Sequence, residues 1–557
     1  MKLKLKTLTP VHVSTGKDLE PFDYLGSNEE VYRISLEKAL EVISEEVPDA
    51  HEQFSDWLDV NLFKHDNQKN AQNHQANRQQ SKIRREINFG VFCRGHLNKP
   101  ALVDKILKSA VVYKMPLPLG MANNSQINEQ IKSPDNLPYI PGSSIKGAVR
   151  TALAANAWLK LNPDERRRIT RDTKANMKEF KPKKYYAGKD EDLMKLLFSC
   201  DSNGEERFDA ARFSILKFFH FSDAHPVSSE EKETMETNPV FLYLKDKEPQ
   251  PQTNTQEMIA PNIIFEFDLT IDTQGLLKAF KESKKERGIW RDLEKKLEWL
   301  IDVKISDIQD DLEKKLIEAL FVVLNKHAKN TYDRDSKWFD GLHYFTQQNG
   351  IHSTTIKRIR KFHDSGLPTE GGTLKTGWGS GFLSTTIFHS LKQTDEPFLK
   401  EMFEDMGIGI GRGGSQKKTP PNLEYFPKSR RMTARQISIP ESVIGWIQIA
   451  EDFKPEEMKK PEDTTDKESE KPAPPDNSEK YRTENMKLKK KDSQKMYAKV
   501  LRSEAPNIVC EILHDEISGE YKVRYPSGLP ANSFVQLNVT FTKKGEIQTV
   551  TFAKALV

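Results

Sequence analysis

Two stretches of the chain alternate hydrophobic and polar positions with the period of a β-strand. Residues 3–8 read Leu-Lys-Leu-Lys-Thr-Leu, and residues 263–271 alternate in the same way. Successive side chains of a strand point to opposite faces, so each stretch predicts a strand with one buried face. After the first strand, Pro10 and Gly16 bound a segment that predicts a turn, with His12 and two hydroxyl residues inside it.

Apolar residues take helical spacing directly after Pro141 and Gly142, where the Pro-Gly pair ends an extended segment. We expect Ser143 or Ser144 to cap the first turn of this helix, because a side-chain oxygen there can accept a free backbone N–H. The apolar positions that predict a buried face are Ile145, Val149, Ala152, Leu153 and Leu159.

Two cations share another face of this predicted helix. Lys146 and Arg150 are four residues apart, near the positive end of the helix dipole, where phosphate groups bind favourably. Gly147 costs roughly 1 kcal/mol relative to Ala in a helix, which suggests that another backbone, such as that of RNA, comes close. The alternative is an ordinary capped helix with two solvated cations. A nucleotide P-loop is excluded, because Ala148 and Val149 stand where that motif needs Lys and Ser or Thr.

A glycine-rich segment at residues 371–382 surrounds Trp378. Successive glycines let backbone N–H groups converge on an anion, and an exposed indole offers a face on which a base can stack. The alternative is that the glycines permit tight packing and that the tryptophan belongs to the core. Further on, residues 407–414 mimic a dinucleotide-binding fingerprint, but no helix start follows them, so that interpretation fails.

The charge balance limits where nucleic acid could bind. The chain has 86 Lys and Arg against 82 Asp and Glu, a net charge of +4. Because this is only mildly basic, any nucleic-acid surface must come from local clusters of cations. One such cluster is Lys428, Arg430 and Arg431, which follow two aromatic residues, although a plain surface could carry the same residues.

The cysteines and the hydropathy pattern indicate the cellular setting. Cys93, Cys200 and Cys510 stand far apart, so we expect neither a disulfide framework nor a cysteine zinc site, and a reducing cytoplasm fits best. The sequence contains no apolar run of about 18 residues, and its N-terminus lacks the apolar core of a signal peptide. We therefore expect a soluble cytoplasmic protein without a metal or cofactor.

The composition changes near residue 453. Residues 451–489 are rich in Glu, Lys, Pro, Asp, Ser and Thr, which is typical of a flexible charged linker. Residues 490–557 then contain five strand-like runs separated by turn signals, which predicts a small β-barrel similar to an OB or cold-shock module. The five runs are residues 496–501, 508–513, 521–525, 533–541 and 549–556.

Weaker patterns predict further elements in the first 450 residues. The expected helices are residues 36–43, 54–62, 277–300 and 308–327. The expected strands are residues 31–34, 89–92, 111–113 and 208–221, and a loop rich in Asn, Gln and Lys is expected at residues 64–82.

Three separated segments resemble the RAMP superfamily of CRISPR-Cas proteins. They are residues 10–16 (PVHVSTG), residues 140–153 (IPGSSIKGAVRTAL) and residues 377–382 (GWGSGF). Their order and the chain length are most similar to the family of fifth Csm subunits of type III-A effector complexes. The resemblance covers residues 1–450 and does not extend to the linker and the barrel.

The resemblance implies an α+β fold with tandem RRM-like (ferredoxin-like) domains, at residues 1–260 with insertions and at residues 261–450. It implies a non-catalytic subunit that binds crRNA, caps the crRNA 3′-end side of the complex, and supports crRNA maturation and antiviral defence. The implied partners are crRNA, other Csm subunits, especially the RAMP backbone subunit, and a host nuclease, with no membrane. The residues that we expect to bind RNA are His12, Ser14, Thr15, Gly16, Gly142, Ser143, Ser144, Lys146, Gly147, Arg150, Lys375, Gly377, Trp378, Gly379, Ser380, Gly381, Lys428, Arg430 and Arg431.

Two other functions are consistent with the sequence. One is a metal-independent endoribonuclease that processes precursor crRNA, with His12 as general base at a near-neutral pKa and Lys146 as stabiliser of the pentavalent phosphate. The other is a protein scaffold without RNA contact. For His12 the plain alternative is a turn histidine that makes one hydrogen bond.

Overall fold

The computed structural model divides the chain into two compact units, Met1–Met458 and Lys459–Val557. The residues that it describes are 1–26, 30–66, 88–116, 127–167, 169–170, 189–200, 211–227, 234–244, 247–285, 289–308, 310–349, 362–406, 408, 423–424, 426–436, 439–453, 493–504, 507–514, 517, 519–524, 534–542 and 547–556. Most of the predicted linker at 451–489 lies outside these residues. Within the described residues, no helix combines the length and the hydrophobicity needed to cross a membrane.

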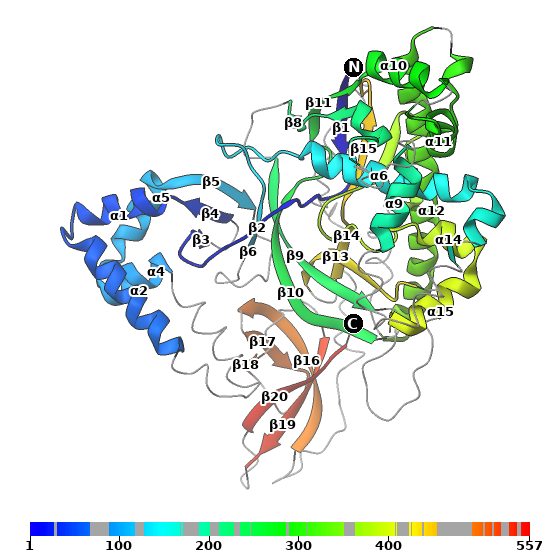
Figure 1. Ribbon diagram of the computed structural model, residues 1–557. Helices are drawn as coiled ribbons and strands as arrows, with labels where there is room; N and C mark the ends of the chain where they lie inside the picture. Colours follow the sequence, from blue (N-terminus) through cyan, green and yellow to red (C-terminus); the bar gives the residue numbers. More distant parts are fainter. Residues whose placement is uncertain are drawn as a thin grey trace. The chain divides into compact units, whose positions relative to one another are not determined.

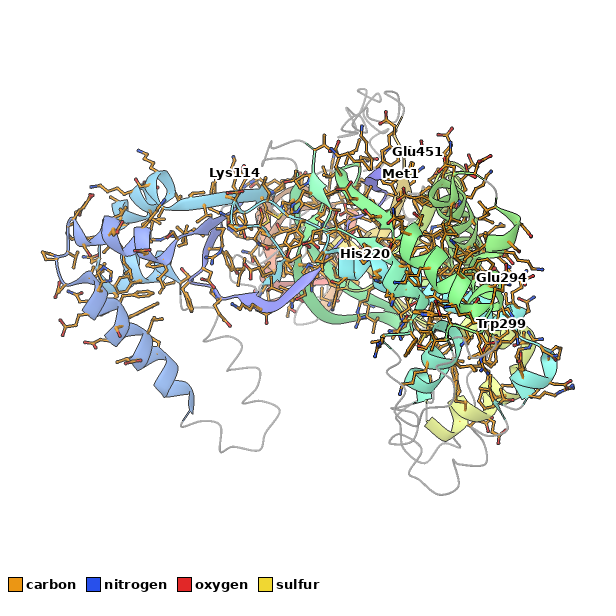
Figure 2. The ribbon with its side chains drawn as sticks, turned by 45° about the horizontal axis from the view of Figure 1, so that its top comes forward. Met1, Lys114, His220, Glu294, Trp299 and Glu451 are labelled. Carbon is orange, nitrogen blue, oxygen red and sulfur yellow. The ribbon has the colours of Figure 1, made fainter. Side chains whose placement is uncertain are left out.

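The first sheet of the first unit joins strands from both ends of that unit. Its order is β12-β15-β1-β11-β7, with β8 paired to β11, and β1 lies between β15 and β11 in antiparallel register. Met1, just before β1, and Glu451, just after β15, therefore lie side by side at one end of these two strands (Figure 2). The strands are β1 (Lys2–Thr7), β7 (Phe219–Phe221), β8 (His225–Pro226), β11 (Ile264–Ile271), β12 (Gly372–Lys375) and β15 (Trp446–Ala450). The two clearest strand predictions are thus confirmed.

Helices cover this sheet and form the main hydrophobic core with it (Figure 1). The predicted helix after Pro141 is confirmed as α6 (Gly142–Lys160), and its apolar face lies in this core, where α6 packs against α11, α12 and α14. The other helices of this group are α9 (Lys189–Phe198), α10 (Thr273–Ser283), α11 (Leu293–Ile301), α12 (Leu312–Asn349), α14 (Phe388–Thr394) and α15 (Glu396–Met406).

Two predictions in this region need correction. The helix expected at 277–300 is two helices, α10 and α11, and Trp290 between them has a φ of 69°, which a helix does not accommodate. The strand expected at 208–221 begins only at Phe219, because Ile215–Phe218 form a 3₁₀ turn whose apolar side chains are buried. Residues 208–210 lie outside the described part of the chain.

A second sheet has the order β14-β13-β9-β10-β6-β2. Residues 14–16, which we expected in a turn, begin the edge strand β2 instead. The neighbouring strands gave no periodic signal, since β10 contains two prolines and mostly polar residues. The strands are β2 (Ser14–Leu19), β6 (Ile127–Gln130), β9 (Met235–Leu244), β10 (Lys247–Ile259), β13 (Ser429–Gln436) and β14 (Ile439–Val443).

An insertion between β2 and β6 has its own core. Its three-stranded sheet, β3-β4-β5, packs against helices at one end of the unit (Figure 1). The strand expected at 89–92 is helical, because the Asn88 side chain accepts a hydrogen bond from Val91 N at 2.9 Å and Phe89 packs on Phe54. Of the loop predicted at residues 64–82, residues 64–66 instead end helix α2, and residues 67–82 lie outside the described residues. The elements are β3 (Tyr24–Gly26), β4 (Glu30–Ile34), α1 (Leu36–Ser44), α2 (Ala50–Asp66), α4 (Phe89–Val91), the π-helix Phe92–His96, α5 (Ala101–Ser109) and β5 (Val111–Pro116).

The second unit is a nearly closed, barrel-like sheet. All five predicted strands are present, in the antiparallel order β18-β17-β16-β19-β20, and the edge strands β18 and β20 approach one another. Alternate residues of β19 are buried, as the period of two requires. The strands are β16 (Ser493–Glu504), β17 (Asn507–Ile512), β18 (Glu520–Arg524), β19 (Phe534–Phe541) and β20 (Ile547–Leu556).

The mixed α+β class is therefore confirmed, with several sheets in the first unit and a barrel-like sheet in the second. The first compact unit includes both residues 1–260 and residues 261–450, and β1, β11 and β15 share one sheet within it. The boundary at residue 260 and the tandem RRM-like arrangement stay predictions.

Candidate RNA interface

The three segments that carry the RAMP resemblance meet in the structure. The Trp378 N–H donates to the His12 carbonyl oxygen at 2.7 Å. The Thr376 hydroxyl donates to the Ser144 carbonyl oxygen at 3.2 Å. Gly377 has a φ of 79°, and a Cβ there would lie 2.5 Å from the His12 carbonyl oxygen, so glycine is required for this close approach. Backbone contacts thus join positions far apart in the sequence at one place.

The N-terminus of α6 is capped differently from our expectation. Neither Ser143 nor Ser144 caps it with a side chain; instead the Gly142 N–H donates to Asp223 Oδ1 at 2.8 Å. Gly142 is buried, and a Cβ there would clash with the Phe221 carbonyl oxygen. Gly142 is explained by packing against the end of β7, and the cap comes from a carboxylate beyond that strand.

The two cations of α6 have different environments. Lys146 is half-buried, and its ammonium donates to the Phe219 carbonyl oxygen at 2.8 Å; burial lowers its pKa. Arg150 is exposed, with its guanidinium carbon 5.9 Å from the Phe198 ring centroid. Gly147 is also exposed, and a Cβ there would meet no atom within 4 Å among the described residues. Packing inside the protein therefore does not explain this glycine.

His12 is buried, with an exposed fraction of 1%. Its Nδ1–H donates to the Glu257 carbonyl oxygen at 2.6 Å, so Nε2 carries no proton, and Nε2 has no hydrogen-bond partner in the described residues. Burial lowers the pKa of His12, the hydrogen bond to Glu257 opposes this and the charge of Lys132 adds to it, and the resulting pKa is about 4. The imidazole is thus neutral at pH 7, which differs from the near-neutral pKa that a general base would need.

Glu257, whose backbone carbonyl oxygen accepts the His12 N–H, also carries a buried carboxylate that our sequence analysis missed. The Glu257 side chain is fully buried and accepts hydrogen bonds from Tyr113 at 2.6 Å and from Lys132 at 2.6 Å. It also accepts the Gln130 N–H at 3.0 Å. Because these partners come from β5, β6 and the segment after β6, the carboxylate connects the insertion to the second sheet. Its position in a polar strand gave no sequence signal.

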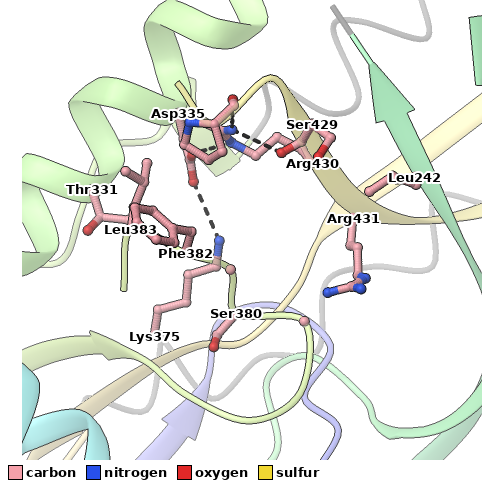
Figure 3. Close-up of a pocket in the computed structure, with 13 residues that line it drawn as sticks. Leu242, Thr331, Asp335, Lys375, Ser380, Phe382, Leu383, Ser429, Arg430 and Arg431 are labelled. Carbon is pink, nitrogen blue, oxygen red and sulfur yellow. Dashed lines mark hydrogen bonds and ion pairs between the residues drawn. The ribbon is translucent and has the colours of Figure 1, made fainter. Parts of the chain in front are cut away.

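Two of the expected RNA-binding cations lie inside the protein. Arg430 Nε is 2.6 Å from Asp335 Oδ1, and Lys375 Nζ is 3.4 Å from Asp335 Oδ2; these side chains are at most 9% exposed (Figure 3). Burial alone would raise the pKa of Asp335, but the charges of Arg430 and Lys375 outweigh it and lower the pKa to about 2. Both cations therefore neutralise a carboxylate of α12 in this structure.

Trp378 and Arg431 lie nearer the surface. Trp378 is half-buried against Val240, Met258 and Ile444, and the exposed Arg431 has its guanidinium carbon 4.9 Å from the indole ring. This cation–π contact covers part of the indole. The tryptophan therefore shares features of both interpretations, a packed residue and a stacking surface.

A pocket of about 280 Å³ lies beside the glycine-rich segment, and we call it the glycine-loop pocket. Its walls include Gly379–Gly381 and Leu383, and Lys375, Arg430 and Arg431 surround it (Figure 3). Its cationic lining is compatible with a phosphate or a polar base edge.

The expected RNA-binding residues differ in accessibility. Three of them, Ser14, Thr15 and Gly16, lie on the edge strand β2, where the Thr15 hydroxyl is 3.1 Å from Glu129. Exposed members of the whole set are Ser14, Thr15, Gly16, Ser143, Gly147, Arg150, Gly381, Lys428 and Arg431. Half-buried members are Ser144, Lys146, Gly377, Trp378 and Gly379, and buried members are His12, Gly142, Ser380, Arg430 and the side chain of Lys375.

Metal ligation has no candidate in this region. Across the described part of the chain, no group of three or more His, Cys, Asp and Glu side chains is arranged to hold a metal ion. The three cysteines are free and buried.

Comparisons with known proteins concern mainly the first unit. The family model described as the RAMP superfamily matches residues 4–415. A chain in a cryo-EM structure of a Csm–crRNA–target RNA ternary complex of a type III-A CRISPR-Cas system is 18% identical, with a TM-score of 0.48, over 81% of this chain and 100% of that chain. The crystal structure of T. onnurineus Csm5 is 18% identical, with a TM-score of 0.47, over 80% of this chain and 99% of that chain.

No curated protein matches the sequence. The family model, however, covers most of the chain and includes all three segments that meet around His12 and Trp378. The chain therefore belongs to the RAMP superfamily.

Proposed function

We propose that this chain is a non-catalytic crRNA-binding subunit of a type III-A Csm effector complex, on the side that holds the crRNA 3′ end. In this proposal it contacts the RAMP backbone subunit and supports crRNA maturation together with a host nuclease in the cytoplasm. We also propose that its first unit derives from two RRM-like folds that share strands. The observation that carries the proposal is the meeting of the His12, Ser144 and Trp378 segments in a chain of this superfamily.

The accessible cations around this meeting point suit an RNA backbone. Arg150 on α6, and Lys428 and Arg431 at the start of β13, are exposed. Phosphate contacts supply affinity without sequence preference, which suits a subunit that must accept guides of any sequence. In the proposed complex these side chains bind RNA, whereas Lys375 and Arg430 shape the pocket beside them.

The state of His12 favours binding over cleavage. A general base must come within hydrogen-bond reach of the proton that it removes. His12 is buried, and its Nδ1–H is committed to the Glu257 carbonyl oxygen. Lys146, the expected stabiliser of the phosphate, donates to the Phe219 carbonyl oxygen. The nitrogen with the free lone pair, His12 Nε2, is buried as well, so cleavage by this pair would require Nε2 to become accessible to RNA.

Co-expression tests this proposal. We expect the tagged chain to co-purify with the other Csm-type subunits and with crRNA, and the purified complex to protect the crRNA 3′ region from added nuclease. The variant Arg431→Gln with Lys428→Gln should reduce that protection, while Lys38→Gln, an exposed cation of the insertion, should not. A chain that purifies alone and without RNA would contradict the proposal, and cleavage of repeat RNA that His12→Ala abolishes would favour the endoribonuclease.

A further inference from the structure

A larger cavity lies along α6, on the side of Lys146 and Arg150, and we call it the α6 cavity. Its volume is about 630 Å³. Lys146, Gly147 and Arg150 form one wall, and Lys217 lies on the wall that leads into β7. Met194, Phe198 and Leu216 give the cavity an apolar part. This volume is in the range of pockets that enclose a small organic ligand.

Four cations line the α6 cavity, namely Lys146, Arg150, Lys195 and Lys217. Among the described residues, no Asp or Glu lines the cavity, and Lys146, Arg150 and Lys217 form no ion pair there. Lys146 donates to a carbonyl oxygen, Arg150 lies over Phe198, and the Lys217 ammonium is 4.7 Å from the Trp290 ring centroid.

This arrangement has an electrostatic consequence. Lys146, Arg150 and Lys217 carry like charges around one space and repel one another, and burial of Lys146 removes part of its hydration. An anion in the cavity would relieve both costs. The glycine-loop pocket differs in this respect, because both of its buried cations pair with the Asp335 carboxylate.

We propose that the α6 cavity binds the terminal nucleotide of the RNA, with a terminal phosphate held by Lys146, Arg150 and Lys217 and the base against the apolar wall. The inference rests on the proposed function and names the part of the RNA that this site takes. A terminal phosphate monoester carries about −1.5 to −2 charges at pH 7, whereas a phosphodiester carries one, so the monoester better matches three cations. In the proposed complex this end is the crRNA 3′ end.

The side of α6 that faces the cavity permits a close approach. Gly147 lies between Lys146 and Arg150 in the sequence. The space that a Cβ would take at this position is open. A side chain there would narrow the entry to the cavity and separate the phosphate from the two cations. Packing inside the protein does not explain this exposed glycine. In our proposal it lets the phosphate come close to the two cations.

The test compares RNAs that differ only at their ends. Three oligonucleotides of one sequence carry a 3′-phosphate, a 5′-phosphate or hydroxyls at both ends, and their affinities for the full-length chain are measured at fixed salt. We expect the 3′-phosphate RNA to bind about tenfold more tightly than the other two, since a charge-assisted contact contributes about that factor. Equal affinity of all three RNAs would overturn the inference while leaving RNA binding, and hence the proposed function, intact. If no RNA binds, the proposed function fails as well.

Substitutions in the cavity test which residues cause the preference for the 3′-phosphate. Arg150→Gln, at an exposed position, and Lys217→Met should each remove most of the preference for the 3′-phosphate, and Gly147→Val should do so by filling the entry. Lys38→Met, on the insertion, is the matched control and should keep the preference. Thermal unfolding confirms that each variant is folded, and the exposed Arg150→Gln keeps the test valid if Gly147→Val destabilises the helix. A preference that survives in Arg150→Gln and Lys217→Met together would place the phosphate elsewhere and contradict the inference.

Discussion

The cations of the glycine-rich region and those of α6 are similar in the sequence, but their surroundings in the structure differ. Lys375 and Arg430 point inward and share the carboxylate of Asp335. Lys146 and Arg150 line a cavity to which no described residue contributes a carboxylate. What decides the role of a cation is thus whether a distant element brings a carboxylate to it. A compensated cation stabilises the fold, and an uncompensated one is available for an anionic ligand.

The largest effect should follow from removing the shared carboxylate. Asp335→Ala leaves two buried cations without their counter-ion, so we expect the free energy of unfolding to fall by about 3–5 kcal/mol. Asp333→Ala is the matched control on the same helix, because Asp333 forms an exposed pair with Lys329 at 3.1 Å, and it should cost about 0.5 kcal/mol. Urea unfolding of both variants measures the difference. Similar losses in both would mean that the buried pairs do not stabilise the fold.

The buried state of His12 predicts a pH dependence of stability. The pKa is about 4 in the folded protein against an ordinary value of 6.5, so the unfolded chain takes up the proton first as the pH falls. The contribution of the neutral imidazole is therefore complete above pH 6.5 and is lost towards pH 4, by up to about 3 kcal/mol.

His12→Gln should weaken this dependence between pH 6.5 and 4, as measured by urea unfolding at several pH values. His220→Gln serves as control, since this histidine is exposed on β7 (Figure 2). The same pH profile in wild type and His12→Gln would show that His12 is accessible to protons in the folded state, and the endoribonuclease function would regain support.

Two neighbouring arginines of β13 give the sharpest form of the comparison. Arg430→Gln removes the charge-assisted hydrogen bond to Asp335 Oδ1 and should cost about 1.5–3 kcal/mol of folding stability. Arg431→Gln should change stability by about 0.5 kcal/mol or less and instead weaken RNA binding, with the slope of log K against log salt reduced by about 0.7. Salt titrations and thermal unfolding separate the two effects. Equal effects of the two substitutions on RNA affinity would contradict the assignment.

The smallest effect is expected from the second unit. Its strand β18 exposes Lys522 and Arg524, although Arg502 is paired with Glu520 at 2.8 Å. We expect deletion of residues 490–557 to leave assembly and short-RNA affinity unchanged and to weaken binding of longer RNA, because a tethered second site adds affinity only when one RNA reaches both. Equal affinity of both proteins across a length series of RNAs would favour a protein partner for this unit.

The helices and strands with a regular hydrophobic period could be predicted from the sequence. The carboxylates that pair with the buried cations could not. The strands β1 and β11, the helix α6 and the five strands of the second unit follow from periods of two and 3.6. The second sheet was missed, because a strand such as β10 is polar and relies on its neighbours for hydrogen bonds rather than on an apolar face.

The candidate site was predicted in outline only. The three segments around His12, Ser144 and Trp378 do come together. Some of their side chains are buried and others are exposed, however, and the local sequence does not show which. Asp335 lies 40 residues before Lys375 and 95 before Arg430, so its pairing depends on the packing of α12. Only that packing distinguishes the inward arginine from its exposed neighbour, Arg431.

Photo-crosslinking tests the central claim most directly, namely that RNA binds to the accessible residues around the meeting point of the three segments. A crRNA carrying photoreactive bases near its 3′ end is irradiated in the assembled complex, and the crosslinked peptides are identified by mass spectrometry. The account predicts crosslinks to peptides that contain Trp378, Arg431 and Gly147, with the Trp378 signal reduced in Arg431→Gln. Crosslinks that occur only in the insertion or the second unit, or no crosslinks at all, would contradict it.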